Sequence, residues 1–174
     1  TVTAPAPTVG GIRPQTRLVY SALQAYYKNT SGTIVASGVT VYRNTSVASC
    51  RTTASCTGGA DEVVATTSYG PQTAGVANNL LPVSVTAGAG DGSLSATTAF
   101  GYDSVGNRLT VDGPLAGTAD TTRTRYDVVR QVVGVVSPDP DGAGALVPRA
   151  QRFTYNLDGQ VTLGEAGTVA DQSD

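Results

Sequence analysis

The chain has 174 residues, a formal net charge of -2 and 14% charged residues. Its 11 Lys and Arg residues are scattered, so no basic patch could neutralise a phosphate backbone, and nucleic-acid binding is disfavoured. No apolar stretch approaches the roughly 18 residues needed to cross a bilayer, so we expect no membrane span. Because the sequence begins with Thr rather than Met, we expect a processed, excised or partial chain.

The composition suits thin sheets better than a thick globular core. Aromatic residues make up only 6% of the chain, Trp and Met are absent, and Gly accounts for 21 residues. A compact globule of this size would use more large apolar side chains, whereas Gly, Thr, Val and Tyr favour strands and tight turns. No segment combines a helical period with a capping box. The sequence therefore predicts an all-β fold with little or no helix, in which successive β-hairpins form an extended or spiral antiparallel sheet.

From the N-terminus, residues 1–15 hold three prolines and Gly10-Gly11, which predict an irregular leading segment or linker. Residues 16–98 predict a β-rich upstream region. Its expected strands are Thr16–Tyr20, Leu23–Lys28, Thr33–Arg43, Asp61–Tyr69, Leu80–Thr86 and Ser93–Asp103. Within these strands, Ser37-Gly38 indicates a bulge or a second turn, and Pro82 indicates an edge position or a bulge.

Two polar or Gly-rich segments of this region predict turns. Residues 29–32 join two expected strands, and Gly88–Gly92 predicts a flexible turn. The second segment is not a phosphate-binding loop, because no Lys-Ser or Lys-Thr pair follows it.

Cys50 and Cys56 belong to a predicted loop over residues 50–60. Their spacing admits a disulfide that closes a small loop, two free thiols, or a metal or redox site. A metal site would need two more ligands and the chain has no His, while a redox pair usually has the Cys-x-x-Cys spacing. A disulfide fits an oxidising compartment, so this interpretation favours an extracellular or cell-surface location.

Residues 99–174 contain three similar units, each centred on a tyrosine. The tyrosines are Tyr102, Tyr126 and Tyr155, spaced by 24 and then 29 residues. Pro114 and Pro138 each fall 12 residues after a tyrosine. A repeat of this period usually means one supersecondary unit that is stacked several times. The residues that define the repeat are Tyr102, Asp103, Gly106, Arg108, Tyr126, Asp127, Tyr155 and Gly159.

The sequence of one unit predicts a β-hairpin. The residues before the tyrosine form a strand, and the segment Tyr-Asp-x-x-Gly reverses the chain. The Asp side chain can accept hydrogen bonds from backbone amides, and Gly supplies the positive φ that a tight turn requires. A single hairpin is marginally stable in water, so each unit is expected to pack against its neighbours.

These tyrosine-aspartate units closely resemble the YD repeats of bacterial RHS-type proteins. The resemblance implies a spiral β-sheet that winds into a hollow shell around a cargo, often a toxin, in an exported or surface protein. Two units depart from the repeat pattern, with Arg130 in the place of Gly and Asn156 in the place of Asp, so we expect both turns to be degenerate. The resemblance covers most of residues 16–174 and includes the upstream segments 23–28, 56–63 and 78–82.

Several residues allow a specific functional interpretation as an alternative to a structural role. The three tyrosines could pack across strands or form a sugar-binding ladder. Asp103 and Asp127, at equivalent positions, could shape turns or form a carboxylate pair for hydrolysis. The segment 139–142 resembles either a turn or a calcium loop, although an EF-hand would need further ligands. Without His, no ordinary Ser–His or Cys–His pair can form.

We therefore expect no enzyme activity, no cofactor and no metal site. The first functional hypothesis is a structural segment of an exported YD-repeat protein, too short to close a shell by itself. It would either continue in a longer chain, with a possible toxin cargo, or associate with its own copies through open sheet edges and form a fibre. The alternative is a cell-surface adhesion or glycan-binding module, which would need clustered aromatic residues or a concave polar site.

Overall fold

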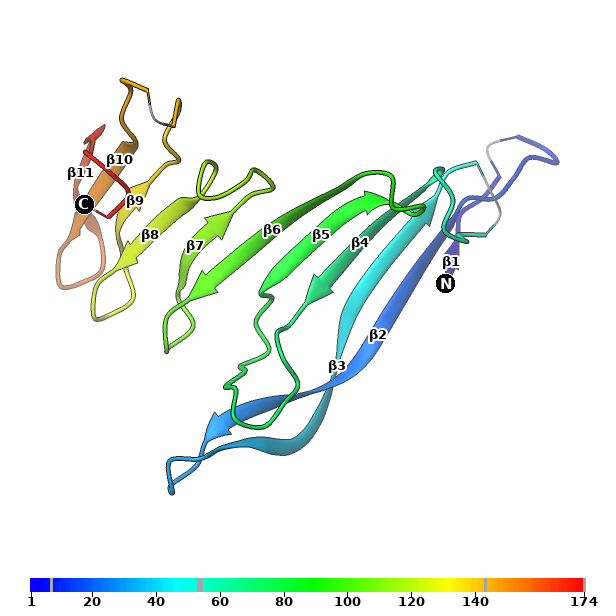
Figure 1. Ribbon diagram of the computed structural model, residues 1–174, viewed down its shortest axis with the longest axis horizontal. Coiled ribbons are helices and arrows are strands. Elements are labelled where there is room, and N and C mark those ends of the chain that lie inside the picture. Colours follow the sequence, from blue (N-terminus) through cyan, green and yellow to red (C-terminus); the bar gives the residue numbers. More distant parts are fainter. Residues whose placement is uncertain (7, 53–54, 143, 174) are drawn as a thin grey trace. The chain divides into compact units, whose positions relative to one another are not determined.

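The computed structural model describes residues 1–6, 8–52, 55–142 and 144–173, so one residue of the leading segment and residues 53–54 of the cysteine loop lie outside it. The described residues contain strands and no helix, which confirms the all-β prediction (Figure 1). The strands are β1 (Val2–Thr3), β2 (Gln15–Lys28), β3 (Ile34–Cys50), β4 (Glu62–Ser68), β5 (Ser84–Ala89), β6 (Ser95–Tyr102), β7 (Arg108–Asp112), β8 (Thr122–Tyr126), β9 (Val132–Val136), β10 (Arg149–Tyr155) and β11 (Val161–Thr168).

The strands form one open antiparallel sheet in which the order in space follows the order in sequence, from β1 to β11. Each strand from β2 to β10 therefore lies between the strands directly before and after it in the chain, as successive hairpins require. The chain divides into two compact units, Thr1–Thr97 and Thr98–Asp174, and the boundary falls within β6.

The first unit is built around the long hairpin β2–β3. The two strands pair from Gln15 opposite Cys50 to Lys28 opposite Ile34. Two register shifts interrupt the pairing, and the second places the three residues Ser37–Val39 of β3 opposite the single residue Ala25 of β2. Gly38 lies there with φ +72°, a left-handed conformation that glycine adopts without steric cost. This feature is a bulge, one of the two structures that the sequence allowed at this site.

Four expected strands have clearly different bounds in the structure, and one of them, Thr33–Arg43, continues to Cys50 as β3. The segments predicted as two short strands over 16–28 form the single strand β2, because β3 pairs with it across the whole length. The prediction of a strand over Leu80–Thr86 was also wrong, since β5 begins only at Ser84. Leu80 has a positive φ of 58°, and its amide bonds to Asn78 Oδ1, so the chain turns there, and Pro82 precedes the strand. The leading segment is not wholly irregular, because β1 pairs with the start of β2.

The β2–β3 hairpin extends beyond β4 as a two-stranded arm (Figure 1). The connection between β4 and β5 returns along this arm. Tyr26 and Asn78 form an antiparallel bridge, with the Tyr26 amide 2.8 Å from the Asn78 carbonyl. The Gln24 amide donates to Gln72 Oε1 at 2.8 Å. The connection thus supplies hydrogen bonds to the edge of β2 at Gln24 and Tyr26, where no described strand pairs with it.

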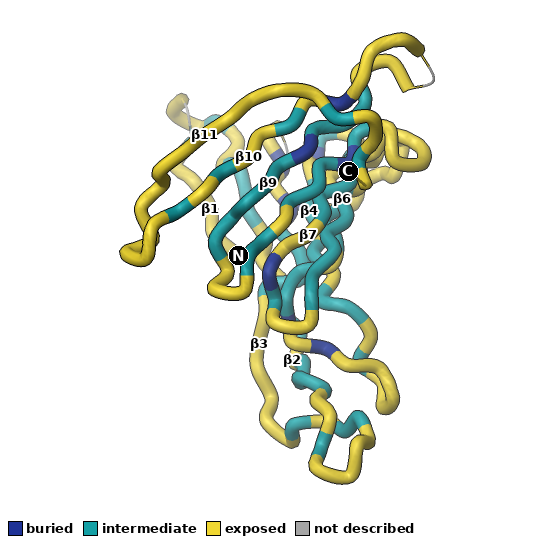
Figure 2. Tube along the Cα trace, turned by 90° about the vertical axis from the view of Figure 1, so that its left-hand side faces the viewer, coloured by how far each residue is buried: buried dark blue, intermediate teal, exposed yellow. Residues whose placement is uncertain are grey.

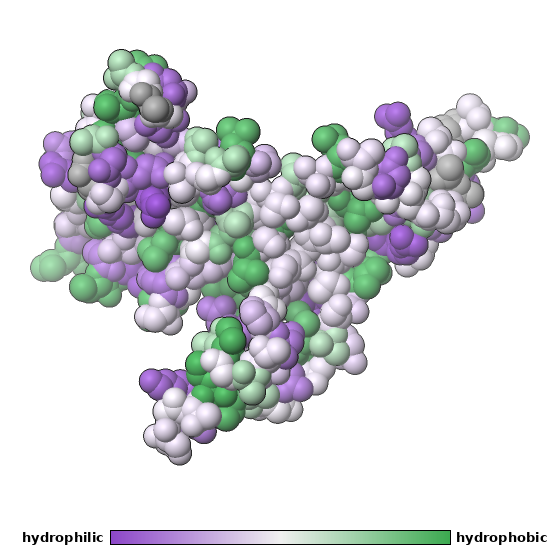
Figure 3. Space-filling view, viewed as in Figure 1, coloured by the Kyte–Doolittle hydropathy of each residue, from purple (hydrophilic) through white to green (hydrophobic). Residues whose placement is uncertain are grey.

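Few apolar side chains are fully buried, as the composition predicts (Figure 2). The space-filling view shows hydrophobic side chains at the surface of both units (Figure 3). The sheet therefore depends on backbone pairing and on side-chain hydrogen bonds more than on a thick core. In the described part of the chain, the buried apolar residues are Ala48, Cys50, Cys56, Leu80 and Val136.

The second unit contains three hairpins, β6–β7, β8–β9 and β10–β11. The C-terminal segment folds back onto the second hairpin. Gln172 Nε2 donates to the carbonyls of Thr121 and Ser137, the latter at 3.1 Å, and Arg125 donates to the carbonyl of Ser173. The two Gln172 bonds satisfy carbonyl groups where β8 begins and β9 ends.

Candidate functional site: the tyrosine hairpins and the disulfide loop

The turn of the first tyrosine hairpin is held by the side chain of Asp103. Its Oδ1 accepts hydrogen bonds from the amides of Val105 at 3.0 Å and Asn107 at 2.8 Å. The Asp103 amide donates to the Asn107 carbonyl, and the Gly106 amide donates to the Asp103 carbonyl. Gly106 has φ +89°, as a three-residue hairpin loop with a left-handed third position requires.

The second and third turns have the same geometry as the first. The prediction that these two turns are degenerate was therefore wrong. Asp127 Oδ1 accepts the amides two and four residues later, at 3.0 and 2.8 Å. Asn156 Oδ1 does so at 3.0 and 2.9 Å, because an amide oxygen accepts as a carboxylate oxygen does. Arg130 adopts φ 70° and Gly159 adopts φ +77° at the position equivalent to Gly106. The turn therefore requires the side-chain acceptor and the left-handed residue, not one particular residue type.

A fourth turn of this kind closes the β2–β3 arm. Asn29 Oδ1 accepts the amides of Ser31 at 3.1 Å and Thr33 at 2.9 Å. Gly32 has φ +80° and its amide bonds to the Asn29 carbonyl. The sequence predicted a turn here but not its kinship with the repeat, because Lys28 stands where the repeat has tyrosine. The spacing Asn-x-x-Gly was the signal that could have revealed it.

A tyrosine hydroxyl joins each later hairpin to the one before it. Tyr126 Oη donates to the carbonyl of Arg108 at 3.2 Å, and Tyr155 Oη donates to the carbonyl of Val132 at 2.7 Å. Arg108 and Val132 are equivalent, since each lies opposite the tyrosine of its own hairpin. The register also shifts at this tyrosine in all three hairpins. These bonds assign Tyr126 and Tyr155 a role between hairpins.

Arginines make two further contacts among the repeats. The Arg108 guanidinium lies over the ring of Phe100, 5.7 Å from its centroid. Arg130 Nε donates to Asn107 Oδ1 at 2.8 Å, which joins the second turn to the first. The left-handed Arg130 thus gains a partner that glycine would lack. Asn107 is buried, so its side-chain oxygen would otherwise lose a hydrogen-bond partner.

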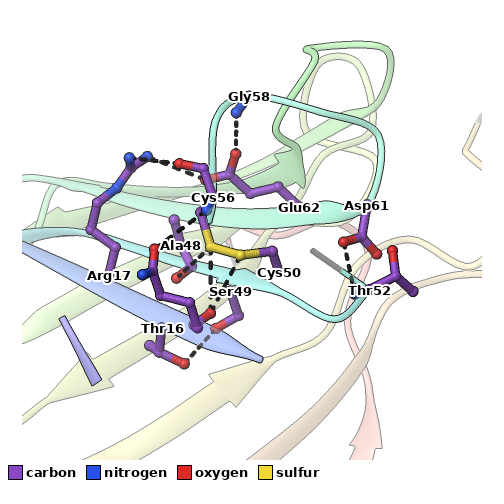
Figure 4. Close-up of a disulfide and its surroundings, with 11 residues drawn as sticks. Thr16, Arg17, Ala48, Ser49, Cys50, Thr52, Cys56, Gly58, Asp61 and Glu62 are labelled. Atoms are coloured by element: carbon purple, nitrogen blue, oxygen red, sulfur yellow. Dashed lines mark hydrogen bonds and ion pairs between the residues drawn. A yellow bond between two sulfur atoms is a disulfide. The ribbon is translucent and has the colours of Figure 1, made fainter. Parts of the chain in front are cut away.

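Cys50 and Cys56 form a disulfide, which confirms the first of the three interpretations (Figure 4). Both cysteines are buried, and with Ala48 they form a small apolar cluster against which Val64 packs. The Cys56 amide also donates to Gln15 Oε1 at 3.3 Å. The disulfide thus fixes the start of the cysteine loop to β2 and β3.

An ion pair between the half-exposed Arg17 and the buried Glu62 holds the other end of the same loop (Figure 4). Glu62 is 2% exposed, and its carboxylate accepts hydrogen bonds from Arg17, at 3.3 Å, and from the Gly58 amide. Arg17 also donates to the Cys56 carbonyl at 2.7 Å. A Cβ at Gly90 would lie 2.7 Å from Glu62 Oε2, so glycine is required where β5 ends. Because Arg17 and the Gly58 amide satisfy the Glu62 carboxylate, its role is structural.

The acidic segment 139–142 forms a turn. Asp139 Oδ1 accepts the amides of Asp141 at 3.2 Å and Gly142 at 3.1 Å, and Asp141 Oδ2 accepts the amide of Leu146 at 3.1 Å. Both carboxylates therefore bind their own loop. Within residues 1–6, 8–52, 55–142 and 144–173, no group of three or more Asp, Glu, Cys or His side chains is placed to hold a metal ion.

Two carboxyl groups have lowered pKa values. Hydrogen bonds from the Ser93 hydroxyl and amide lower the pKa of Asp91. At Asp103 burial raises the pKa, but the hydrogen bonds from Asn107 and Val105 outweigh it, and the pKa lies below its ordinary value. In both groups the hydrogen bonds favour the charged form, which is the form that accepts turn amides.

A shallow groove of about 800 Å³ lies on one face of β9, β10 and β11. Its lining includes Gly134, which pairs with Arg152 on β10 and with Arg125 on β8. Arg152 forms an ion pair with Glu165 at 2.6 Å, and Arg125 binds the Ser173 carbonyl. Both cations that line the groove are therefore already engaged, and the remaining lining is mainly apolar and small.

No protein-family model and no curated protein matches this chain. The resemblance to YD repeats therefore rests on the motif residues of the sequence alone. Over the residues that the structure describes, no helix is long and apolar enough to cross a lipid bilayer.

Proposed function

We propose that this chain is a non-catalytic structural segment of an exported YD-repeat protein, whose hairpins form part of a β-sheet shell or of a fibre. The observation that supports this proposal best is the tyrosine bond between consecutive hairpins. The same hydroxyl binds the equivalent carbonyl at Tyr126 and again at Tyr155. A bond that recurs with the repeat serves the stacking of hairpins, and stacking is what an extended sheet requires.

The two edges of the sheet support the same proposal. In the described residues β11 is the last strand, and all eight of its residues are exposed. The opposite edge is the two-residue strand β1. An exposed edge of unpaired backbone groups favours pairing with a further strand, whether it belongs to the same polypeptide or to another copy.

The mass of the chain in solution tests this proposal, measured by light scattering after gel filtration and with electron microscopy of any large species. We expect large particles or filaments. We expect Leu163→Lys to reduce their mass, because a charge on the edge strand opposes pairing. Leu115→Lys is the matched control, since Leu115 is exposed in the connection between β7 and β8. A monodisperse species near 17.6 kDa for the unmodified chain would contradict association through the edges.

A second candidate function, a glycan-binding or adhesion module, has a specific observation in its favour. Tyr20 and Tyr42 are 58% and 70% exposed on the β2–β3 hairpin. Tyr42 lies opposite Ala22, which is two residues from Tyr20, so the two rings occupy diagonal positions on one face. Exposed aromatic faces are suited to the apolar faces of sugars.

A glycan array with the intact chain tests this second candidate. If the hairpin binds sugars, the double variant Tyr20→Ser/Tyr42→Ser should lose the signal, while Tyr155→Phe should keep it. An array without any retained glycan would leave only the structural proposal.

A further inference from the structure

We propose that the tyrosine turns of the second unit form a peripheral binding surface for a phospholipid bilayer, into which their exposed aliphatic side chains insert. The side chains of this turn row are Val105, Val128, Val129 and Leu157. The inference goes beyond the proposed structural function and does not depend on the association of copies.

The turn itself does not require apolar residues at these positions. Each turn uses the acceptor side chain of its first residue and the left-handed conformation of its fourth, so the two residues between them are free to vary. In the turn of the β2–β3 arm they are Thr30 and Ser31, which are polar as expected for a solvated turn.

The middle residues of the three turns in the second unit are Ser104, Val105, Val128, Val129, Leu157 and Asp158. Four of these six are apolar. The apolar character therefore belongs to this end of the second unit and not to the type of turn.

The turn row protrudes into solvent. Val128 and Leu157 are fully exposed, and Val105 and Val129 are 61% and 65% exposed. The three turns close neighbouring hairpins at one end of the unit (Figure 1), so their tips repeat about every 10 Å, twice the distance between strands. Aliphatic side chains that are exposed in such a row mark an interaction surface.

The size of the turn row favours a lipid surface over a folded protein. Four aliphatic side chains bury on the order of a few hundred Å², whereas a stable protein interface needs about 800 Å² from each partner. The tips also project one by one from separate turns. A bilayer can deform around each tip, and its affinity grows with the apolar area that enters it.

Two arginines beside the turns supply donors for lipid phosphate. Arg108 and Arg130 are both exposed. Arg130 binds Asn107 through Nε, and its guanidinium has further N–H donors. Arg108 lies over the ring of Phe100, and a guanidinium that stacks on a ring keeps its N–H groups directed outward in its own plane.

The acidic residues distinguish the two ends of the second unit. At the turns, the carboxylates of Asp103 and Asp127 accept amides of their own turns, while Asp158 is exposed. The connections at the opposite end, residues 113–121 and 137–148, contain three Asp residues and no Lys or Arg. We therefore expect an anionic bilayer to bind the turn end and to be repelled by the connections.

Flotation with phospholipid vesicles tests the proposal. The intact chain is mixed with vesicles of phosphatidylcholine and phosphatidylglycerol in equal parts and centrifuged in a density gradient, where vesicles rise and assembled protein sinks. The test variant is Val128→Ser/Leu157→Ser, which gives two of the turns the polar character of the arm turn. The matched control is Leu115→Ser/Leu146→Ser, because both leucines are 60% exposed at the opposite end.

We expect the original chain and the control to float with the vesicles, and the turn variant to bind on the order of tenfold more weakly. The three chains should have the same urea midpoint, which shows that the variants are folded. An original chain that stays at the bottom of the gradient, or an equal loss of binding in both variants, would overturn the proposal, even if light scattering shows that the chain assembles.

Discussion

The hydroxyl of Tyr155 lies 2.7 Å from the carbonyl of Val132, so the side chain that begins one turn is bonded to the backbone that leaves the previous turn. Tyr126 and Arg108 repeat this relationship one hairpin earlier. The tyrosine is therefore a contact between hairpins as well as a strand residue, and it adds to the backbone pairing that holds the second unit together.

The first prediction concerns this hydroxyl. Tyr155→Phe keeps the ring and removes the bond to Val132, so we expect the free energy of unfolding to fall by about 1 kcal/mol. Urea unfolding followed by circular dichroism measures the change. Tyr42→Phe is the matched control. Tyr42 is largely exposed, so the loss of its hydroxyl should leave the urea midpoint unchanged. Equal effects of the two variants would contradict the assigned role.

The second prediction concerns the left-handed Arg130. Glycine relieves a steric cost of roughly 1–2 kcal/mol at a positive φ. It also removes the donor to Asn107 Oδ1, which leaves a buried acceptor unpaired at a cost of about 1–3 kcal/mol. We expect Arg130→Gly to be neutral or destabilising in the original chain.

The same substitution should stabilise the protein by about 1 kcal/mol when Asn107 is already Ala, because only the relief of steric cost then remains. The original chain, Arg130→Gly, Asn107→Ala and the double variant form a double-mutant cycle, which is measured by their urea midpoints. Identical effects of Arg130→Gly in both backgrounds would show that the Arg130–Asn107 bond contributes nothing.

The third prediction concerns the disulfide. Chain entropy predicts a stabilisation of about 2 kcal/mol for a ring as small as that closed by Cys50 and Cys56. We expect the double variant Cys50→Ser/Cys56→Ser to unfold at lower urea concentration than the oxidised protein. A reductant should lower the midpoint of the original chain and leave that of the variant unchanged. A midpoint insensitive to reductant in the original chain would contradict this expectation.

The fourth prediction concerns acid. The folded state lowers the pKa of Asp103, so this carboxylate contributes stability above its unfolded pKa of about 3.9. The contribution is lost as the pH falls through the lower, folded pKa. Asp103→Asn keeps the oxygen that accepts the turn amides, as Asn156 does in the third turn, but cannot titrate.

We therefore expect the urea midpoint of Asp103→Asn to depend less on pH below about pH 4 than that of the original chain. Asp91 should provide a second, independent part of the acid dependence, because its pKa is also lowered. If the two chains lose stability in parallel as the pH falls, the Asp103 carboxylate does not contribute in this way.

Local chemistry in the sequence predicted much of the fold. Tyr-Asp-x-x-Gly predicted hairpins because an acceptor side chain and a left-handed residue act within a few residues of each other. The bulge at Gly38 was one of two structures predicted for the same local reason. The interruption at Leu80 was not predicted, because a positive φ at leucine depends on its packed surroundings rather than on its own preference.

The contacts between distant residues could not be predicted in this way. Gln172 binds carbonyls 35 and 51 residues away, and Arg17 pairs with Glu62 across the cysteine loop. Nothing in the neighbouring sequence marks these residues, because a lone Gln, Arg or Glu is usually solvated at the surface.

The sequence by itself determined that this chain is an all-β protein of hairpins with local turns, because period, composition and turn residues act over short distances. Only the tertiary structure decided which hairpin each tyrosine joins. The acceptors of Tyr126 and Tyr155 are backbone carbonyls, which every residue has, so only the register between strands selects Arg108 and Val132.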